Sequence, residues 1–218
     1  MIPFRTPDEV TRAIPEVVLH LVRQGLIAYP TETVYGLGST TAPEAVFRLA
    51  DLKGRETGKP FLLLVSDLAM LAAAGLRITD AAARLAAAFW PGALTLVLPG
   101  GEGVLPDVLR GPEGGIAVRW TSHAGTARLV AALGSPITST SANRPKQPGA
   151  MTGAEAAGIF ADAERDGRLV VLDAGRLEHS PPSTLVDCTG RTPRVVREGA
   201  LHPDRLRAIV PALEVPRA

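Results

Sequence analysis

Residues 26–38 read LIAYPTETVYGLG, and this stretch decides how the rest of the chain is interpreted. Leu26 to Tyr29 is a short apolar run, which predicts a buried strand, and the polar loop after it ends in two glycines. Residues 6–22 have a capping threonine, acids in the first turn and an apolar stripe at helical spacing. The chain therefore begins as helix, strand and loop. Loops that leave strand ends are where ligands usually bind, and the alternative for this loop is a polar turn that caps the next helix.

The alternation of helices and strands continues along the chain. Further helices are predicted at residues 43–52, 66–75 and 80–90 and from Thr152 onward; further strands are predicted at residues 61–65, 94–98, 116–118, 136–138, 169–172, 184–186 and 194–197. Because the connections are irregular and residues 99–115 form a long glycine-rich loop, we expect an α/β protein with a mixed sheet. We expect one domain, residues 1–218, with its core at about residues 10–200 and a short C-terminal tail.

Composition limits the classes of function. The formal net charge of +1 argues against a domain whose whole surface binds nucleic acid, although a local basic groove stays open. The single cysteine, Cys188, excludes an internal disulfide and gives no zinc or redox motif. The N-terminus lacks the apolar core of a signal peptide, and no apolar run approaches the ~20 residues that span a bilayer. We expect a cytoplasmic protein without a membrane partner.

Lysine is rare in this chain. It supplies three of the 23 residues that are Lys or Arg, namely Lys53, Lys59 and Lys146, and the only asparagine, Asn143, lies close to the last of them. A compact ammonium retained where arginine is used almost everywhere else indicates anionic ligands, most simply phosphates. Residues 53–60 are not a P-loop, because Lys59 is followed by proline and a strand. A solvated basic turn is the alternative for this segment.

Hydroxyl groups gather in a second segment. Residues 138–143 read TSTSAN and offer four hydroxyls and an amide without a histidine or aspartate at a spacing that would make a nucleophile. Such a cluster is either a site that donates hydrogen bonds to carboxylate or phosphate oxygens, or an edge strand with its turn. Arg119 and Arg197 stand at the ends of predicted strands, where they either reach a site or are surface charges.

Taken together, these segments resemble the threonylcarbamoyl-AMP synthase (YrdC/TsaC-like) family in its short, single-domain form, from about Gly25 to Gly199. The resemblance rests on ordered blocks: residues 29–38, 53–55 with 59–60, 91–95, 118–119, 141–143, 183–187 and 197–199. It implies a twisted mixed sheet flanked by helices, with a concave, positively charged cleft. It also implies an L-threonylcarbamoyladenylate synthase, a nucleotidyltransferase that forms threonylcarbamoyl-AMP and pyrophosphate from ATP, L-threonine and bicarbonate for N6-threonylcarbamoyladenosine in tRNA.

The resemblance assigns roles residue by residue. Lys53 and Arg55 are implied as catalytic. The residues implied for ATP are Lys53, Arg55, Lys59, Ser141, Asn143 and Arg197, and those implied for threonine or its carbamoyl group are Thr33, Arg119, Ser139 and Ser183. ATP is expected as a substrate accompanied by Mg²⁺, no protein metal site is expected, and the adenylate is expected to pass to a tRNA-modifying transfer complex.

Two other functions compete with this one. The same basic cleft could serve a double-stranded RNA or tRNA binding protein, or the chain could be a carbamoyl-transfer domain of a larger maturation enzyme, which the absence of a zinc-finger or acylphosphatase-like neighbour disfavours. The chain also departs from the family pattern at three places: Pro145-Lys146 replaces the usual Ser-Gly, Thr121 replaces a proline, and Leu64 replaces a histidine of some members.

Overall fold

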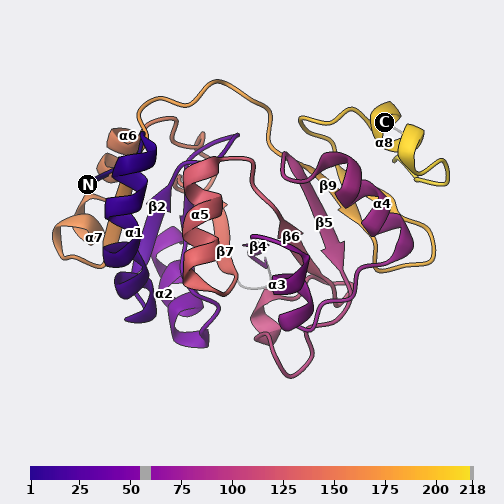
Figure 1. Cartoon of the computed structure of the whole chain (residues 1–218), viewed down its shortest axis with the longest axis horizontal. Helices are drawn as coiled ribbons and strands as arrows, with labels where there is room; N and C mark the ends of the chain where they lie inside the picture. Colours follow the sequence, from indigo (N-terminus) through magenta and orange to yellow (C-terminus); the bar gives the residue numbers. More distant parts are fainter. Residues whose placement is uncertain (55–59, 217–218) are drawn as a thin grey trace.

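A computed structural model describes residues 1–54 and 60–216, and its strands form one mixed sheet of ten (Figure 1). The strands are β1 (Ile2–Pro3), β2 (Leu26–Tyr29), β3 (Gly36–Gly38), β4 (Leu62–Leu64), β5 (Leu94–Leu98), β6 (Ile116–Arg119), β7 (Ile137–Ser141), β8 (Leu169–Asp173), β9 (Thr184–Asp187) and β10 (Arg194–Arg197). Their order across the sheet is β1-β8-β2-β3-β7-β4-β6-β5-β9-β10. Both parallel pairs, such as β2 with β8, and antiparallel pairs, such as β2 with β3, occur, so the predicted mixed sheet is confirmed.

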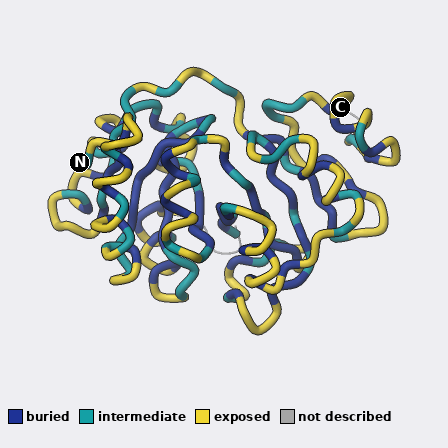
Figure 2. Tube along the Cα trace, viewed as in Figure 1, coloured by how far each residue is buried: buried dark blue, intermediate teal, exposed yellow. Residues whose placement is uncertain are grey.

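Helices flank this sheet. They are α1 (Pro7–Val22), α2 (Pro43–Lys53), α3 (Leu68–Ala73), α4 (Asp80–Phe89), α5 (Ala124–Leu133), α6 (Gly153–Ile159), α7 (Ala161–Arg165) and α8 (Pro203–Ile209), with one 3-10 turn, η1 (Asp107–Leu109). In Figure 1, α1 and α5 lie side by side over one half of the sheet, and α4 lies over the other half. Figure 2 shows the dark, buried strands enclosed by helices whose outer faces are exposed.

The helix starts follow local chemistry that the sequence predicts. Thr6 accepts a hydrogen bond from the Glu9 amide, and the Glu9 carboxylate accepts one from the Thr6 amide, which completes a capping box at α1. Asp67 and Thr152 cap α3 and α6 in the same way, through their side-chain oxygens. The side-chain oxygens of Thr6, Asp67 and Thr152 lower the free energy of the folded chain by accepting hydrogen bonds from amides that have no partner within the helix.

The middle strand β7 joins the two halves of the sheet. Its first part, Ile137 to Ser139, pairs with β4, and its last part, Thr140 to Ser141, pairs with β3. Gly38 on β3 allows this change of partner, because a Cβ there would lie 2.3 Å from the carbonyl oxygen of Thr138. The hydroxyl-rich segment is therefore a central strand and not an edge strand, and its serines lie where the two halves meet.

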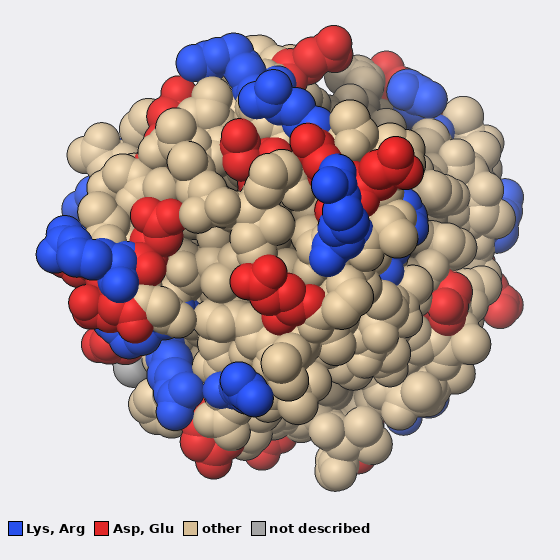
Figure 3. Space-filling view, turned by 60° about the vertical axis from the view of Figure 1, so that its left-hand side comes forward, with Lys and Arg blue, Asp and Glu red and all other residues tan. Residues whose placement is uncertain are grey.

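Charges of both signs are scattered over the largely uncharged surface that Figure 3 shows, with Lys and Arg interspersed among Asp and Glu. Within residues 1–54 and 60–216, no helix is both long enough and apolar enough to cross a membrane.

Candidate active site

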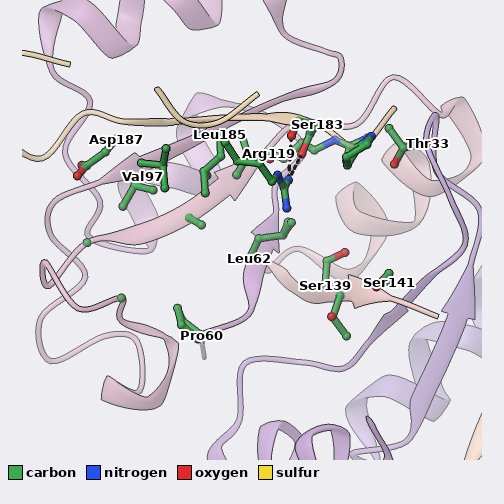
Figure 4. Close-up of a pocket in the computed structure, with 18 of the residues that line it drawn as sticks. Thr33, Pro60, Leu62, Val97, Arg119, Ser139, Ser141, Ser183, Leu185 and Asp187 are labelled. Carbon is green, nitrogen blue, oxygen red and sulfur yellow. Dashed lines mark hydrogen bonds between the residues drawn. The ribbon is translucent and has the colours of Figure 1, made fainter. Parts of the chain in front are cut away.

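A cavity of about 690 Å³ opens at the junction that β7 makes between the two halves of the sheet. Figure 4 shows its two ends: Thr33, Arg119, Ser139, Ser141 and Ser183 lie in one part of the view, and Val97, Leu185 and Asp187 lie in the other. Strands far apart in the sequence thus bring hydroxyls and a guanidinium together beside an apolar wall. This arrangement suits a ligand that has an anionic end and an apolar or aromatic end.

Arg119 is the most buried charge in the cavity wall. Its side chain is 5% exposed, its Nε donates a hydrogen bond of 3.0 Å to Oε1 of Glu32, and its Nη2 lies 2.5 Å from the same oxygen. The second oxygen of Glu32 accepts a hydrogen bond from the hydroxyl of Thr121. The buried Nη2 forms this ion pair with Oε1, and no hydrogen bond to a described residue satisfies its N–H groups. Arg119 is thus paired with a carboxylate on one side and still has unused donors.

Arg197 brings a second guanidinium to the same end of the cavity. Its Nη2 donates hydrogen bonds to the carbonyl oxygen of Ser183 at 2.8 Å and to the Ser183 hydroxyl at 3.2 Å, and this hydroxyl lies 2.8 Å from that of Thr95. Gly199 permits the approach, since a Cβ there would lie 2.1 Å from the carbonyl oxygen of Pro182. Partial burial lowers the pKa of Arg197, and the charge of Arg119 lowers it further. An anion placed between the two guanidinium groups would relieve this repulsion.

Lys53 lies behind the cavity rather than in its wall. Its side chain is buried, and Nζ donates hydrogen bonds to the carbonyl oxygens of Ser141 at 2.6 Å and Asn143 at 2.7 Å and to Oδ1 of Asn143. The Ser141 hydroxyl, which lines the cavity, also donates to Oδ1 of Asn143 at 2.6 Å. Three short contacts match the three N–H groups of an ammonium, so Lys53 holds the turn that presents Ser141 and adds a positive charge close to it.

The loop after β2 is held in a fixed shape. The Thr31 hydroxyl donates to the carbonyl oxygen of Val34 at 2.7 Å, and it accepts from the amides of Thr33 and Val34. At its start, the carbonyl oxygen of Pro30 accepts a hydrogen bond of 2.6 Å from Thr126 on α5. The Thr33 side chain, which lines the cavity, is therefore positioned before any ligand arrives.

The structure brings together most of the residues that the sequence singles out. Thr33, Arg119, Ser139, Ser141, Ser183 and Arg197 line the cavity, and Lys53 and Asn143 support it from behind. Arg55 and Lys59 lie outside the described residues. Glu32, Thr95 and the hydroxyl of Thr121 also contact the residues of the site, and the sequence pattern does not single them out as site residues, although Glu32 lies within residues 29–38.

The far end of the cavity is apolar with a charged rim. Val97, Leu185 and Val196 form part of its wall. At the rim, Nη2 of Arg194 lies 3.4 Å from Oε1 of Glu113 and 3.5 Å from Oδ2 of Asp187. Because the described wall carries acids as well as arginines, a positively charged cleft remains a prediction, while the end that holds Arg119 and Arg197 is cationic.

The three departures from the family pattern have local structural effects. Thr121 is fully buried, and its hydroxyl donates a hydrogen bond to Glu32, which a proline at this position could not do. Lys146 is exposed and has φ of +64°, a conformation that suits the glycine it replaces. Leu64 is buried in the core, and Leu62 is the residue of β4 that lines the cavity.

An α/β sheet with guanidinium groups and hydroxyls at a central junction offers hydrogen-bond donors that suit an anionic small molecule. A family model described as "Telomere recombination" (Sua5_yciO_yrdC) matches residues 20–199. The chain belongs to this Sua5/YciO/YrdC family.

Individual relatives agree with this membership. The chain is 37% identical over 183 residues to a threonylcarbamoyl-AMP synthase of Chromohalobacter salexigens, covering 83% of this chain and 95% of the relative. It is 33% identical over 197 residues to the enzyme of the same name from Pyrococcus abyssi, covering 89% of this chain and 56% of the relative. The crystal structure of P. abyssi Sua5 complexed with L-threonine is similar, with a TM-score of 0.89 and 30% identity, covering 99% of this chain and 62% of that one. The chain thus spans less than two thirds of the P. abyssi protein.

Proposed function

We propose that this chain is a threonylcarbamoyl-AMP synthase, a nucleotidyltransferase that joins L-threonine, bicarbonate and the adenylyl group of ATP and releases pyrophosphate. The observation that carries the proposal is the pair of guanidinium groups, Arg119 and Arg197, at one end of a cavity whose other end is apolar. The names of the relatives, and the L-threonine bound to P. abyssi Sua5, support the choice of substrates.

The chemistry explains why the site is rich in cations. The amine of threonine attacks the carbon of bicarbonate, and loss of water gives a carbamate, which leaves a molecule with two anionic groups. A carbamate oxygen then attacks the α-phosphorus of ATP while the bond to pyrophosphate breaks. Because anions must approach one another, Arg119 and Arg197 would lower the barrier by offsetting their repulsion, and hydroxyls such as Ser183 would orient them.

We assign threonine or its carbamoyl group to the end lined by Thr33, Arg119, Ser139 and Ser183. The adenylyl group and phosphates are assigned to Ser141, Asn143 and Arg197, with Lys53 acting through its charge and through the Ser141 turn, and with Arg55 and Lys59 as further phosphate ligands. The apolar wall beyond them is suited to a base.

Mg²⁺ is expected to enter with the phosphates. In the described part of the chain, His, Cys, Asp and Glu do not gather in any group of three or more that could hold a metal ion. A magnesium ion here would therefore take phosphate oxygens and water as most of its ligands, as Mg²⁺ commonly does in nucleotide sites.

The proposed product is an intermediate for N6-threonylcarbamoyladenosine in tRNA, which requires a transfer complex downstream. Direct RNA binding has less support, because the formal net charge of +1 is far from the large basic excess that is usual in proteins whose main role is to bind nucleic acid.

The proposal is tested by pyrophosphate release from ATP with bicarbonate and either L-threonine or L-serine. We expect release that depends on threonine, with serine a much poorer substrate. Arg197→Gln should lower kcat/KM by roughly 100-fold or more, as expected when a donor to developing charge is removed. Arg84→Gln, at an exposed position on α4, is the matched control and should be unchanged. Equal rates with serine, or normal turnover in Arg197→Gln, would contradict the proposal.

A further inference from the structure

The pairing of Arg119 with Glu32 is incomplete. An arginine and a carboxylate usually pair most strongly side by side, with two N–H groups donating to two different oxygens. Here Nε donates to Oε1, and Nη2 lies against the same Oε1, while the described hydrogen bonds leave Nη2 without an acceptor. Both donors on this edge of the Arg119 guanidinium, Nε and Nη2, therefore face the same oxygen of Glu32.

Thr121 accounts for this arrangement. Its hydroxyl donates to Oε2 of Glu32, so that this oxygen is held away from Nη2. The direction of the hydroxyl proton is itself fixed, because Thr121 Oγ1 accepts a hydrogen bond of 3.2 Å from the amide of His123. Thr121 is fully buried and the Glu32 side chain is 17% exposed, so water does little to loosen the contact.

We propose that Thr121 is a positioning residue that keeps Glu32 from pairing fully with Arg119, and so preserves the affinity of Arg119 for the anionic end of the ligand. The inference rests on the proposed function for the identity of that ligand, L-threonine or its carbamate. The Glu32 carboxylate offsets part of the free-energy cost of burying the Arg119 guanidinium, and Thr121 limits how strongly this carboxylate pairs with Arg119. The remaining terminal nitrogen of Arg119, Nη1, makes no hydrogen bond to the described residues and belongs to a side chain in the cavity wall.

The test compares Thr121→Val, which keeps the shape and removes the hydroxyl, with Thr121→Ser, which retains it. In Thr121→Val, Glu32 is free to turn its second oxygen to Nη2, and we expect the KM for L-threonine to rise about tenfold, the effect of weakening one charge-assisted hydrogen bond. The KM for ATP and kcat should change by less than about twofold, and Thr121→Ser should restore the threonine KM. A threonine KM that is unchanged or lower in Thr121→Val would overturn the inference, as would a Thr121→Ser variant that behaves like Thr121→Val.

Crystal structures of the wild type, Thr121→Val and Thr121→Ser without ligand give a readout that needs no activity. We expect both oxygens of Glu32 on Arg119 in Thr121→Val, and only one in the other two proteins. If Glu32 keeps its position in Thr121→Val, the inference is wrong whatever the protein catalyses. If the wild type releases no pyrophosphate with threonine but Glu32 turns as expected, the proposed function fails and the positioning role of Thr121 stands.

Discussion

Replacing Lys53 by methionine tests whether this lysine holds the structure of the site as well as adding positive charge to it. The residue is 6% exposed, and its ammonium donates to two carbonyl oxygens and to Oδ1 of Asn143. Methionine fills a similar volume but removes all three of these hydrogen bonds, although the Ser141 hydroxyl still donates to Oδ1 of Asn143 and the backbone amide of Asn143 still donates to the carbonyl oxygen of Ser141. Hydrogen bonds from a charged donor contribute about 1.5–3 kcal/mol each, and water can replace part of the loss at the cavity edge, so we expect the free energy of unfolding to fall by about 3 kcal/mol.

The assay is thermal unfolding followed by circular dichroism. For a chain of this size, about 3 kcal/mol corresponds to a fall in Tm of roughly 6–12 °C. Lys146→Met is the matched control, because Lys146 is exposed and a surface substitution usually changes stability by less than about 0.5 kcal/mol. Pyrophosphate release by Lys53→Met, measured well below its Tm, should also be lost. If Lys53→Met unfolds at the same temperature as Lys146→Met, the ammonium does not hold the Ser141 turn and the reasoning fails.

Three further predictions concern stability and reactivity. Lys146→Gly should raise the free energy of unfolding by up to about 1 kcal/mol, because φ of +64° strains any residue with a Cβ, whereas Lys146→Ala should bring no gain in urea titrations. Hydrogen bonds from backbone amides lower the pKa of Glu9, Asp67 and Glu155 at helix starts, so the stabilisation of the fold by these carboxylates should be complete above about pH 4.5 and lost as the pH falls through the lowered pKa values. A triple variant, Glu9→Gln, Asp67→Asn and Glu155→Gln, should lose less stability than the wild type between about pH 5 and 3. An equal loss in the two proteins would argue against this role of the carboxylates. Burial raises the pKa of Cys188 to about 12, so a thiol reagent at pH 8 should modify the native protein far more slowly than the urea-unfolded protein, and equal rates would show that the thiol is accessible.

The sequence predicts elements well where the pattern is local. The apolar run Leu94 to Leu98 is β5 with the predicted bounds, and the capping box at Thr6 begins α1. Helix α5 is missed, because a glycine at position 125 in its first turn looks like a helix breaker. In the structure, this glycine lies where Phe4 packs, since a Cβ there would be 2.8 Å from the Phe4 ring. Tertiary packing therefore decides an element that propensity alone does not.

The site shows the same division. The residue types that would bind an anion, such as Arg119, Ser141 and Arg197, can be read from strand ends and from the hydroxyl cluster. Their partners cannot, because Glu32 meets Arg119 across 87 positions of sequence. Three strands lie between β2 and β6 in the sheet, so the contact depends on the path of the loop after β2. The lysine scarcity points to the segment that holds Lys53, behind the cavity, but it does not reveal that the Lys53 ammonium bonds to backbone oxygens.

The central claim is that this cavity assembles threonylcarbamoyl-AMP. The most direct measurement is mass spectrometry of the products after the purified chain is incubated with ATP, L-threonine and ¹³C-bicarbonate. We predict an adenylate whose mass carries the label from bicarbonate and which disappears when threonine, bicarbonate or ATP is omitted. An adenylate without the label, or no adenylate from a folded protein that binds ATP, would contradict the claim.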